Sequence, residues 1–323
     1  MAASGNLQGY AGSARLRPLE LLPWVLAIAT YFLAQGYLAL ASYVLIICLF
    51  ALSLDLIVGY AGIVTLGHAA YFGFGAYVAG ILAVHCSSDP LLGLVAACLA
   101  SAVFGAATGA LILRTQGLAL IMLTLAMSSI VFEVANKWTG LTGGTDGLQG
   151  VPIAPILGSF SFDMFGRTAY LYCLAVLIVG WWLVRTIVYS PFGRALVGTR
   201  ENAARMQAIG APVYLRRLLA YTIAAALAGT AGALLTQTTQ FVGLSVVGFE
   251  LSGEILVILV LGGVGRIYGA LVGPVVYIVA RDYFAKQSPD YWYLGIGILL
   301  MLVVLFARGG ILGLVDKAKA RFS

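Results

Sequence analysis

The sequence predicts an all-α polytopic membrane protein with about 8 to 10 transmembrane helices. Of its 323 residues, 62% are hydrophobic and 9% are charged, whereas soluble proteins carry roughly 25% charged residues. One water-soluble core of this size cannot hide such an apolar surplus, so the bilayer is the expected solvent. The 40 glycines agree with this, because helices that pack closely in lipid favour small residues.

Ten apolar segments are candidate spans, since a spanning helix needs about 20 mostly apolar residues. They are residues 21–36, 39–59, 64–85, 90–112, 117–137, 169–188, 214–238, 251–264, 268–284 and 291–308. Residues 64–85 are rich in glycine and could re-enter the membrane, and residues 251–264 are short for a crossing. A transmembrane domain is thus expected over residues 21–308, between terminal segments 1–20 and 309–323.

The basic residues give an orientation and exclude other classes. With the N-terminus inside and spans alternating, only four of the 18 Lys and Arg residues fall outside: Lys137, Arg167, Arg281 and Lys286. This bias predicts cytoplasmic termini, a cytoplasmic segment 189–213 and an external loop 138–168. Basic residues at span ends are topology signals, so the net charge of +6 does not indicate nucleic acid. The apolar run from Leu21 to Leu54 is too long for a signal-peptide core.

Segment 189–213 is a charged segment in an apolar chain, and it predicts a short docking helix. Asn202 to Ile209 can form two turns, with Glu201 at the start, Gly210 as C-cap and Pro212 beyond it. Two turns are marginal in water, so this helix needs a surface to settle on. The alternative is a linker held against the bundle's own end. The docking residues would be Arg200, Glu201, Asn202, Ala203, Ala204, Arg205, Met206 and Gly210.

Polar residues within apolar runs are candidates for a substrate pathway, because ionisable groups in a membrane default to a functional hypothesis. Asp55 could instead serve a helix terminus, His68 could be a packing histidine, and the hydroxyls could bond across helices. The candidates are Asp55, Thr65, His68, Thr124, Ser128 and Ser129.

Two glycine-rich patterns have structural interpretations. Residues 139–150, TGLTGGTDGLQG, form either a flexible external loop that presents bare amides or a connecting turn; its candidates are Thr142, Gly143, Gly144, Thr145 and Asp146. Gly265, Gly269 and Gly273 are four apart and would make a helix groove for a neighbouring backbone.

Charges near the outer side have local explanations. Glu133 and Lys137 are four apart, which favours a stabilising pair on one helix. Glu250 and Glu254 are either exposed acids at an external mouth or a solvated helix start. The sequence has no nucleophile–base set, no Cys/His cluster with metal spacing and no Gly-Lys dipeptide. A phosphate-binding loop is therefore absent, and neither an enzyme nor a metal site is expected.

Several motifs jointly resemble one family. They are residues 54–62 (LDLIVGYAG), 66–77 (LGHAAYFGFGAY), 141–148 (LTGGTDGL), 193–210 (GRALVGTRENAARMQAIG) and 260–274 (VLGGVGRIYGALVGP). Together they resemble the branched-chain amino acid ABC transporter permeases, LivM branch, from about Leu38 to Leu314. Two departures stand out: Ala204 to Gly210 is longer than the EAA-x3-G spacing of ABC importers, and Arg266-Ile267-Tyr268 is a bulky insert.

The resemblance implies an ABC importer permease in a bacterial inner membrane, with residues 193–210 as the loop that couples it to an ATPase. The implied partners are a second permease, two ATPase subunits that bind ATP and Mg²⁺, and a periplasmic substrate-binding protein. The implied cargo is a branched-chain or other hydrophobic amino acid. Urea, short amides or aromatic acids are alternative cargoes for the same fold. A stand-alone secondary transporter is a further alternative, which would favour deep coupling-ion carboxylates and an inverted repeat.

Overall fold

The computed structural model describes residues 22–33, 35–156, 158, 160–163, 166–287, 294–295, 297–298, 301 and 309–313. Its elements are α2 (Leu22–Leu33), η2 (Gln35–Tyr37), α3 (Leu38–Asp55), η3 (Leu56–Tyr60), α4 (Ala69–His85), α5 (Pro90–Ile112), α6 (Leu118–Lys137), α7 (Thr139–Thr142), η4 (Gly144–Asp146), β1 (Leu148–Gln149), α8 (Arg167–Tyr189), α9 (Pro191–Glu201), α10 (Ala203–Ala208), α11 (Val213–Thr239), β2 (Phe241–Val242), η5 (Leu244–Val246), α12 (Phe249–Gly262) and α13 (Gly269–Gln287). The predicted tenth span and both terminal segments lie largely outside the described residues.

Among the described residues, five helical stretches are long and apolar enough to cross a membrane, which confirms the predicted all-α polytopic fold. They are Gln35–Tyr60, Pro90–Ile112, Leu118–Lys137, Arg167–Tyr189 and Val213–Thr239. Each lies within a few residues of a predicted span. Two shorter apolar helices, Pro23–Leu33 and Ala69–His85, accompany them.

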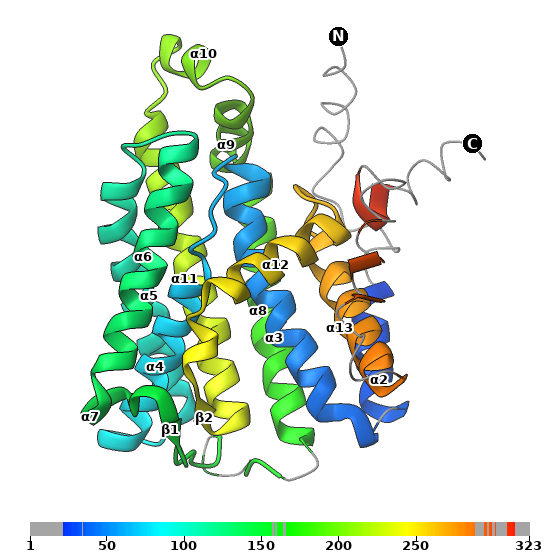
Figure 1. Cartoon of the computed structure of the whole chain (residues 1–323). Coiled ribbons are helices and arrows are strands. Elements are labelled where there is room, and N and C mark those ends of the chain that lie inside the picture. Colours follow the sequence, from blue (N-terminus) through cyan, green and yellow to red (C-terminus); the bar gives the residue numbers. More distant parts are fainter. Residues whose placement is uncertain are drawn as a thin grey trace, which may run out of the picture.

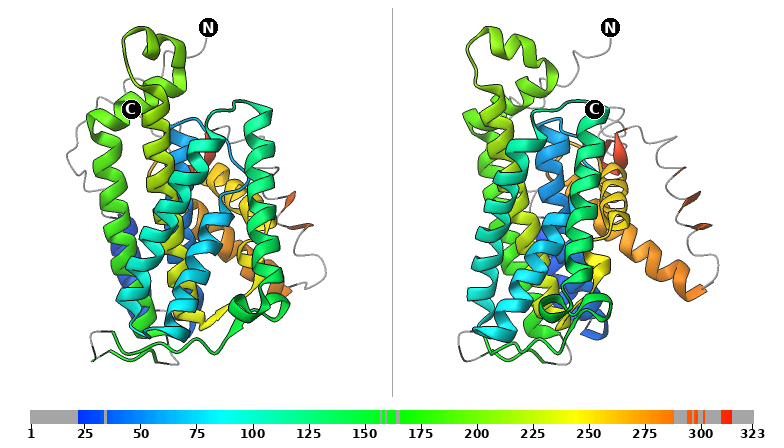
Figure 2. Two further views of the ribbon diagram at one scale, coloured as in Figure 1. Left: turned by 90° about the vertical axis from the view of Figure 1, so that its left-hand side faces the viewer. Right: turned by 60° about the vertical axis from the view of Figure 1, so that its left-hand side comes forward.

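α3 and α11 form the centre of the bundle: α4 and α5 pack against α11, α8 packs against α3, and α6 packs against α4 (Figures 1 and 2). Every residue of α3 from Leu45 to its end is buried, which explains why its sequence shows no polar face. Small residues bring α11 close to its neighbours: a Cβ atom on Gly232 would overlap the carbonyl of Phe72 on α4. One on Gly105 of α5 would overlap Ala225.

The bundle has two distinguishable ends. At the strand end, β1 pairs antiparallel with β2, and Leu148 lies opposite Val242. At the other end, which we call the α10 end, α9 and α10 project beyond the long helices (Figures 1 and 2).

Two shorter helices, α4 and α12, begin inside the bundle instead of at its ends. After η3, a π-helical turn, residues 61–68 are non-helical and return toward the middle of the bundle, where α4 starts at Ala69. α12 likewise starts beside the middle of α6, because Ser128 Oγ donates to Val247 O at 3.2 Å. The two segments doubted from sequence, 64–85 and 251–264, thus contain shortened helices preceded by irregular chain. Irregular backbone at membrane depth is tolerated where protein or water surrounds it.

Candidate functional site

α9 and α10 are two short helices, and each begins with a capping side chain. Ser190 Oγ accepts a hydrogen bond from Gly193 N at 3.3 Å and starts α9. Asn202 Oδ1 accepts from Arg205 N at 2.8 Å and starts α10. The helix predicted from Asn202 to Ile209 includes all of α10. The prediction contained no counterpart of α9, whose two glycines weaken the helical signal.

The end of α10 also follows from local chemistry. Gly210 has a φ of 80°, a left-handed conformation that glycine adopts without strain and that ends many helices. Met206, predicted to face a partner, packs over Gly198 of α9. Ile209 is instead 72% exposed. The outer surface of α10 therefore combines an exposed apolar side chain with Arg205, which is also exposed.

Arg200 turns back toward its own bundle. Its guanidinium donates a hydrogen bond to the carbonyl of Gly59 in η3. Its aliphatic part fills the space beside Gly62, whose φ is 69°. Arg200 was expected to be one of the docking residues, yet here it joins α9 to the interrupted end of α3.

Asp55 lies at the same junction. Its side chain is 1% exposed, and its Oδ1 accepts a hydrogen bond from Gly265 N at 2.7 Å. Oδ2 is buried and has no partner among the described residues. A Cβ atom on Gly59 would overlap Asp55 Oδ1 and lie 2.6 Å from Gly265 N. The α9 segment, the end of α3 and the turn between α12 and α13 therefore meet with no spare space.

His68 lies in the core immediately before α4. Ser53 Oγ donates to Phe50 O at 2.6 Å, so its lone pair accepts from His68 Nε2 at 2.8 Å. This assigns the proton to Nε2 and leaves Nδ1 buried without a partner among the described residues. The His68 ring also stacks on Phe50, with 5.4 Å between centroids. These contacts are those of a packing histidine.

The candidate hydroxyls hold the irregular chain in place. Thr124 Oγ1 accepts from Leu66 N at 3.4 Å, and Thr65 Oγ1 accepts from Gly67 N at 3.2 Å. Ser128 binds the chain before α12, as given above. These groups satisfy backbone amides and carbonyls that would otherwise be unpaired in the bundle. Ser129 differs, because it lies on the exposed face of α6.

Ser252 is a structural residue that sequence reasoning missed. Its Oγ accepts from Ala69 N at 2.9 Å, so a side chain of α12 caps the start of α4. Gly59 and Gly62 at the Arg200 junction were also missed as individual positions. A serine in an apolar run carries no pattern that reveals such a distant partner.

The external-loop residues form a compact turn. Thr142 Oγ1 donates to the carbonyl of Trp138 at 2.9 Å and accepts from Gly144 N at 3.3 Å. Gly143 and Gly144 both have positive φ, while Thr145 and Asp146 are exposed. Of the two interpretations of this loop, the geometry corresponds to the connecting turn.

The three packing glycines do not share one helix. Gly269 and Gly273 lie on α13, where Cβ atoms would overlap the carbonyls of Gly263 and Ile258. Gly265 lies in the preceding turn with a φ of 76°, where its N–H reaches Asp55. The expected groove therefore consists of two glycines, and the third has a different position.

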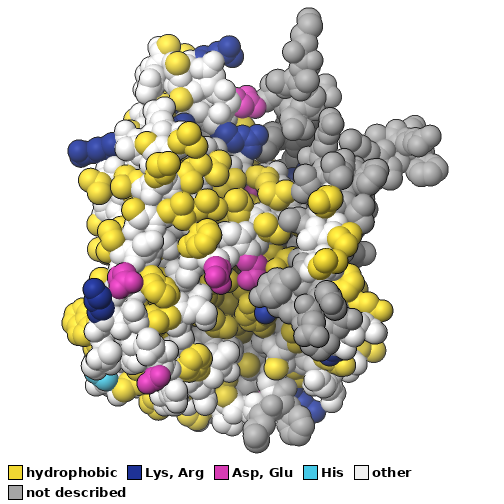
Figure 3. Space-filling view, in the orientation of Figure 1, with side chains coloured by type: hydrophobic (Ala, Val, Ile, Leu, Met, Phe, Trp, Pro, Cys, Tyr) yellow, Lys and Arg dark blue, Asp and Glu magenta, His cyan; other side chains and the backbone are white. Residues whose placement is uncertain are grey.

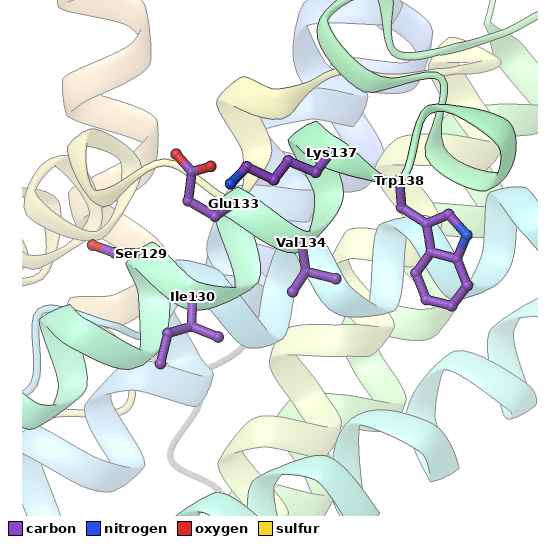
Figure 4. A pocket seen from close by; sticks show the side chains of 6 residues that line it. All are labelled: Ser129, Ile130, Glu133, Val134, Lys137 and Trp138. Carbon is purple, nitrogen blue, oxygen red and sulfur yellow. The ribbon is translucent and has the colours of Figure 1, made fainter.

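The described residues contain no group of three or more His, Cys, Asp or Glu side chains that could bind a metal ion. A shallow hollow of about 600 Å³ lies along the exposed side of α6 (Figure 4). It is lined by Ser129, Ile130, Glu133, Val134, Lys137 and Trp138.

Comparisons with known proteins agree in one family. Residues 36–304 match the family described as branched-chain amino acid transport system / permease component. The high-affinity branched-chain amino acid transport system permease protein LivM of Salmonella typhimurium is 29% identical over 315 residues, which cover 89% of this chain and 73% of that protein.

Two further relatives extend this result. LivM of Escherichia coli is 28% identical over 310 residues, with the same coverage. A probable branched-chain amino acid transport permease protein LivH of Methanocaldococcus jannaschii is 25% identical over 279 residues, covering 81% of this chain and 85% of that protein. No solved structure matches the chain.

Proposed function

Because the chain belongs to the branched-chain amino acid transport permease family, we propose that it is one permease subunit of an ATP-driven importer of branched-chain or other hydrophobic amino acids. The chain is a multi-pass membrane protein of a transport system. In the proposal it lies in a bacterial inner membrane with both termini in the cytoplasm. Its partners are a second permease of the family, two ATPase subunits that bind ATP and Mg²⁺, and a substrate-binding protein outside.

The projecting α9–α10 segment carries this proposal. α10 is too short to be stable alone, is exposed on most of its residues, and presents Ile209 to solvent. A surface of this kind is suited to a protein cleft. The chain is similar both to proteins named LivM and to proteins named LivH. This similarity supports a pair of related permeases in one transporter.

The contacts of α9 suggest how nucleotide binding acts on the bundle. Movement of α10 with an ATPase subunit displaces α9, and Arg200 transmits that displacement to η3 at the end of α3. Asp55 and Gly265 extend the same junction to the turn before α13. A change on one surface thereby biases two interrupted crossings, as a two-state transporter requires.

The Ala204→Asp variant tests this proposal, because Ala204 is exposed on α10. In the reconstituted transporter, a charge forced into the ATPase contact should lower uptake about tenfold or more per ATP hydrolysed. Membrane insertion should be unaffected. Ser161→Asp, an equal charge change at an exposed residue near the strand end, is the matched control. Unchanged uptake with Ala204→Asp would contradict docking through α10.

Two experiments distinguish the proposal from the alternative cargoes and from the alternative mechanism. Urea, short amides or aromatic acids would be identified by calorimetry on the binding protein encoded beside this chain. A stand-alone secondary transporter would purify alone and transport with an ion gradient but without an ATPase. That outcome would overturn the proposal.

A further inference from the structure

The start of α12 lies halfway between the two ends of the bundle. Ser128, which bonds to Val247, is near the middle of α6, and Ser252 caps the inner end of α4. Glu250 lies between these two contacts, in the first turn of α12. Of the two interpretations of Glu250, an external mouth and an exposed helix start, its position in the first turn of α12 corresponds to the helix start.

Glu250 is an exposed charge at this depth. Glu254, one turn later, forms an ion pair with Arg281 at 3.0 Å. No described residue forms an ion pair or hydrogen bond with the Glu250 carboxylate. Figure 3 shows acidic side chains among hydrophobic ones in the middle of this face.

A lipid environment does not suit this face. A charged side chain at the centre of a bilayer is disfavoured by a factor of about 100 in insertion, so such residues face protein or a water-filled space. On the neighbouring α6, Ser129, Glu133 and Lys137 are also exposed and line one hollow (Figure 4). α6 also exposes Ile130 and Trp138, but the exposed residues of α8 from Leu171 to Leu183 include no charged side chain.

We propose that α6 and the first turn of α12 form one wall of a water-filled passage, closed by the second permease, and that Glu250 binds the ammonium group of the amino acid there. This rests on the proposed function. The second permease is the occupant that the charges favour, because lipid would leave Glu250 uncompensated. An ammonium group has the charge and the donors that complement an unpaired carboxylate.

Thiol accessibility in the assembled transporter tests the passage. Glu250→Cys and Val179→Cys are made in a chain whose four native cysteines are replaced, and treated with a charged, membrane-impermeant thiol reagent. Because only a hydrated thiolate reacts, Glu250→Cys should react about tenfold or more faster than Val179→Cys. Equally slow reaction at both positions would overturn the passage.

Uptake by Glu250→Gln tests the ammonium contact. Loss of a charge-assisted contact should lower uptake of the amino acid about tenfold or more, while Glu250→Asp retains a larger share. Asp282→Asn is the matched control, since it removes an exposed surface pair with Lys286. Each variant must also copurify with the partner subunits in wild-type amounts, so that a loss of uptake does not reflect a loss of assembly.

The outcomes separate this inference from the proposed function. If the wild-type assembly imports with ATP and Glu250→Gln imports equally well, the ammonium contact is wrong and the permease role stands. If the wild-type assembly imports without ATP, the proposed function itself fails. A neutral cargo such as urea would be imported equally by both forms, and that too would overturn the ammonium contact.

Discussion

Single side chains tie together parts of this protein that are remote in sequence. Arg200 reaches Gly59 across 141 positions, and Asp55 reaches Gly265 across 210. In both cases the distant partner is a backbone group. Such contacts leave no complementary residue pair in the sequence, which is why Arg200 could be predicted as important but its contact could not.

The first prediction concerns the crowded contact at Gly59. Gly59→Ala would force a Cβ atom into Asp55 and Gly265, and overpacking of this kind lowers the free energy of unfolding by about 1–3 kcal/mol. Gly253→Ala on α12 is the control, because nothing lies within 4 Å of its added Cβ. Thermal unfolding in detergent measures both; an equal midpoint for the two variants would refute the crowding.

The second prediction concerns the cap of α10. Asn202→Ala removes the acceptor for Arg205 N, which costs about 1 kcal/mol of local helix stability. Hydrogen exchange of the α10 amides should accelerate about fivefold. Gln207→Ala, exposed on the same helix but not a cap, should change exchange little. The sequence predicted a helix from Asn202 with Gly210 as its C-cap, but it did not identify Asn202 as the N-cap.

At the scale of whole elements, the length of an apolar run identifies the long membrane-spanning helices. It does not show where a shorter helix starts inside the bundle. The spans at 90–112 and 117–137 correspond to α5 and α6 because each helix satisfies its own backbone groups. The starts of α4 and α12 depend instead on groups from other helices. Ser252 provides one of these groups for α4, and no local periodicity could reveal it.

The third prediction addresses that shared start. Ser252→Ala leaves Ala69 N without an acceptor in the core, and an unsatisfied buried N–H costs about 1–3 kcal/mol. Ser129→Ala, an exposed serine on α6, should change stability by less than about 0.5 kcal/mol. Unfolding midpoints in detergent provide the comparison. A loss no larger than in the control would show that another group satisfies Ala69.

For the molecule as a whole, the sequence predicted the fold class and the family, and both are confirmed. The composition predicted the fold class, because few structures accommodate so many apolar residues. Several motifs taken together predicted the family. The arrangement of charge on the α6–α12 face could not be predicted, since it depends on how an irregular segment places Glu250 in space.

The fourth prediction concerns orientation. Ala208→Cys on α10 and Gln149→Cys on β1 are exposed near opposite ends. In a chain whose four native cysteines are replaced, an impermeant thiol reagent added to intact cells should label only the second, because the positive-inside bias predicts a cytoplasmic α10. Labelling of Ala208→Cys from outside would reverse the orientation and remove α10 as an ATPase contact.

The hydrogen bond between Asp55 and Gly265 also bears on biogenesis. At a synthesis rate of about 5–20 residues per second, roughly 10–40 s separate the two residues as they leave the ribosome. During that interval the nascent carboxylate has no native donor. The junction between α3 and the turn before α13 therefore forms only after about four-fifths of the polypeptide has been synthesised.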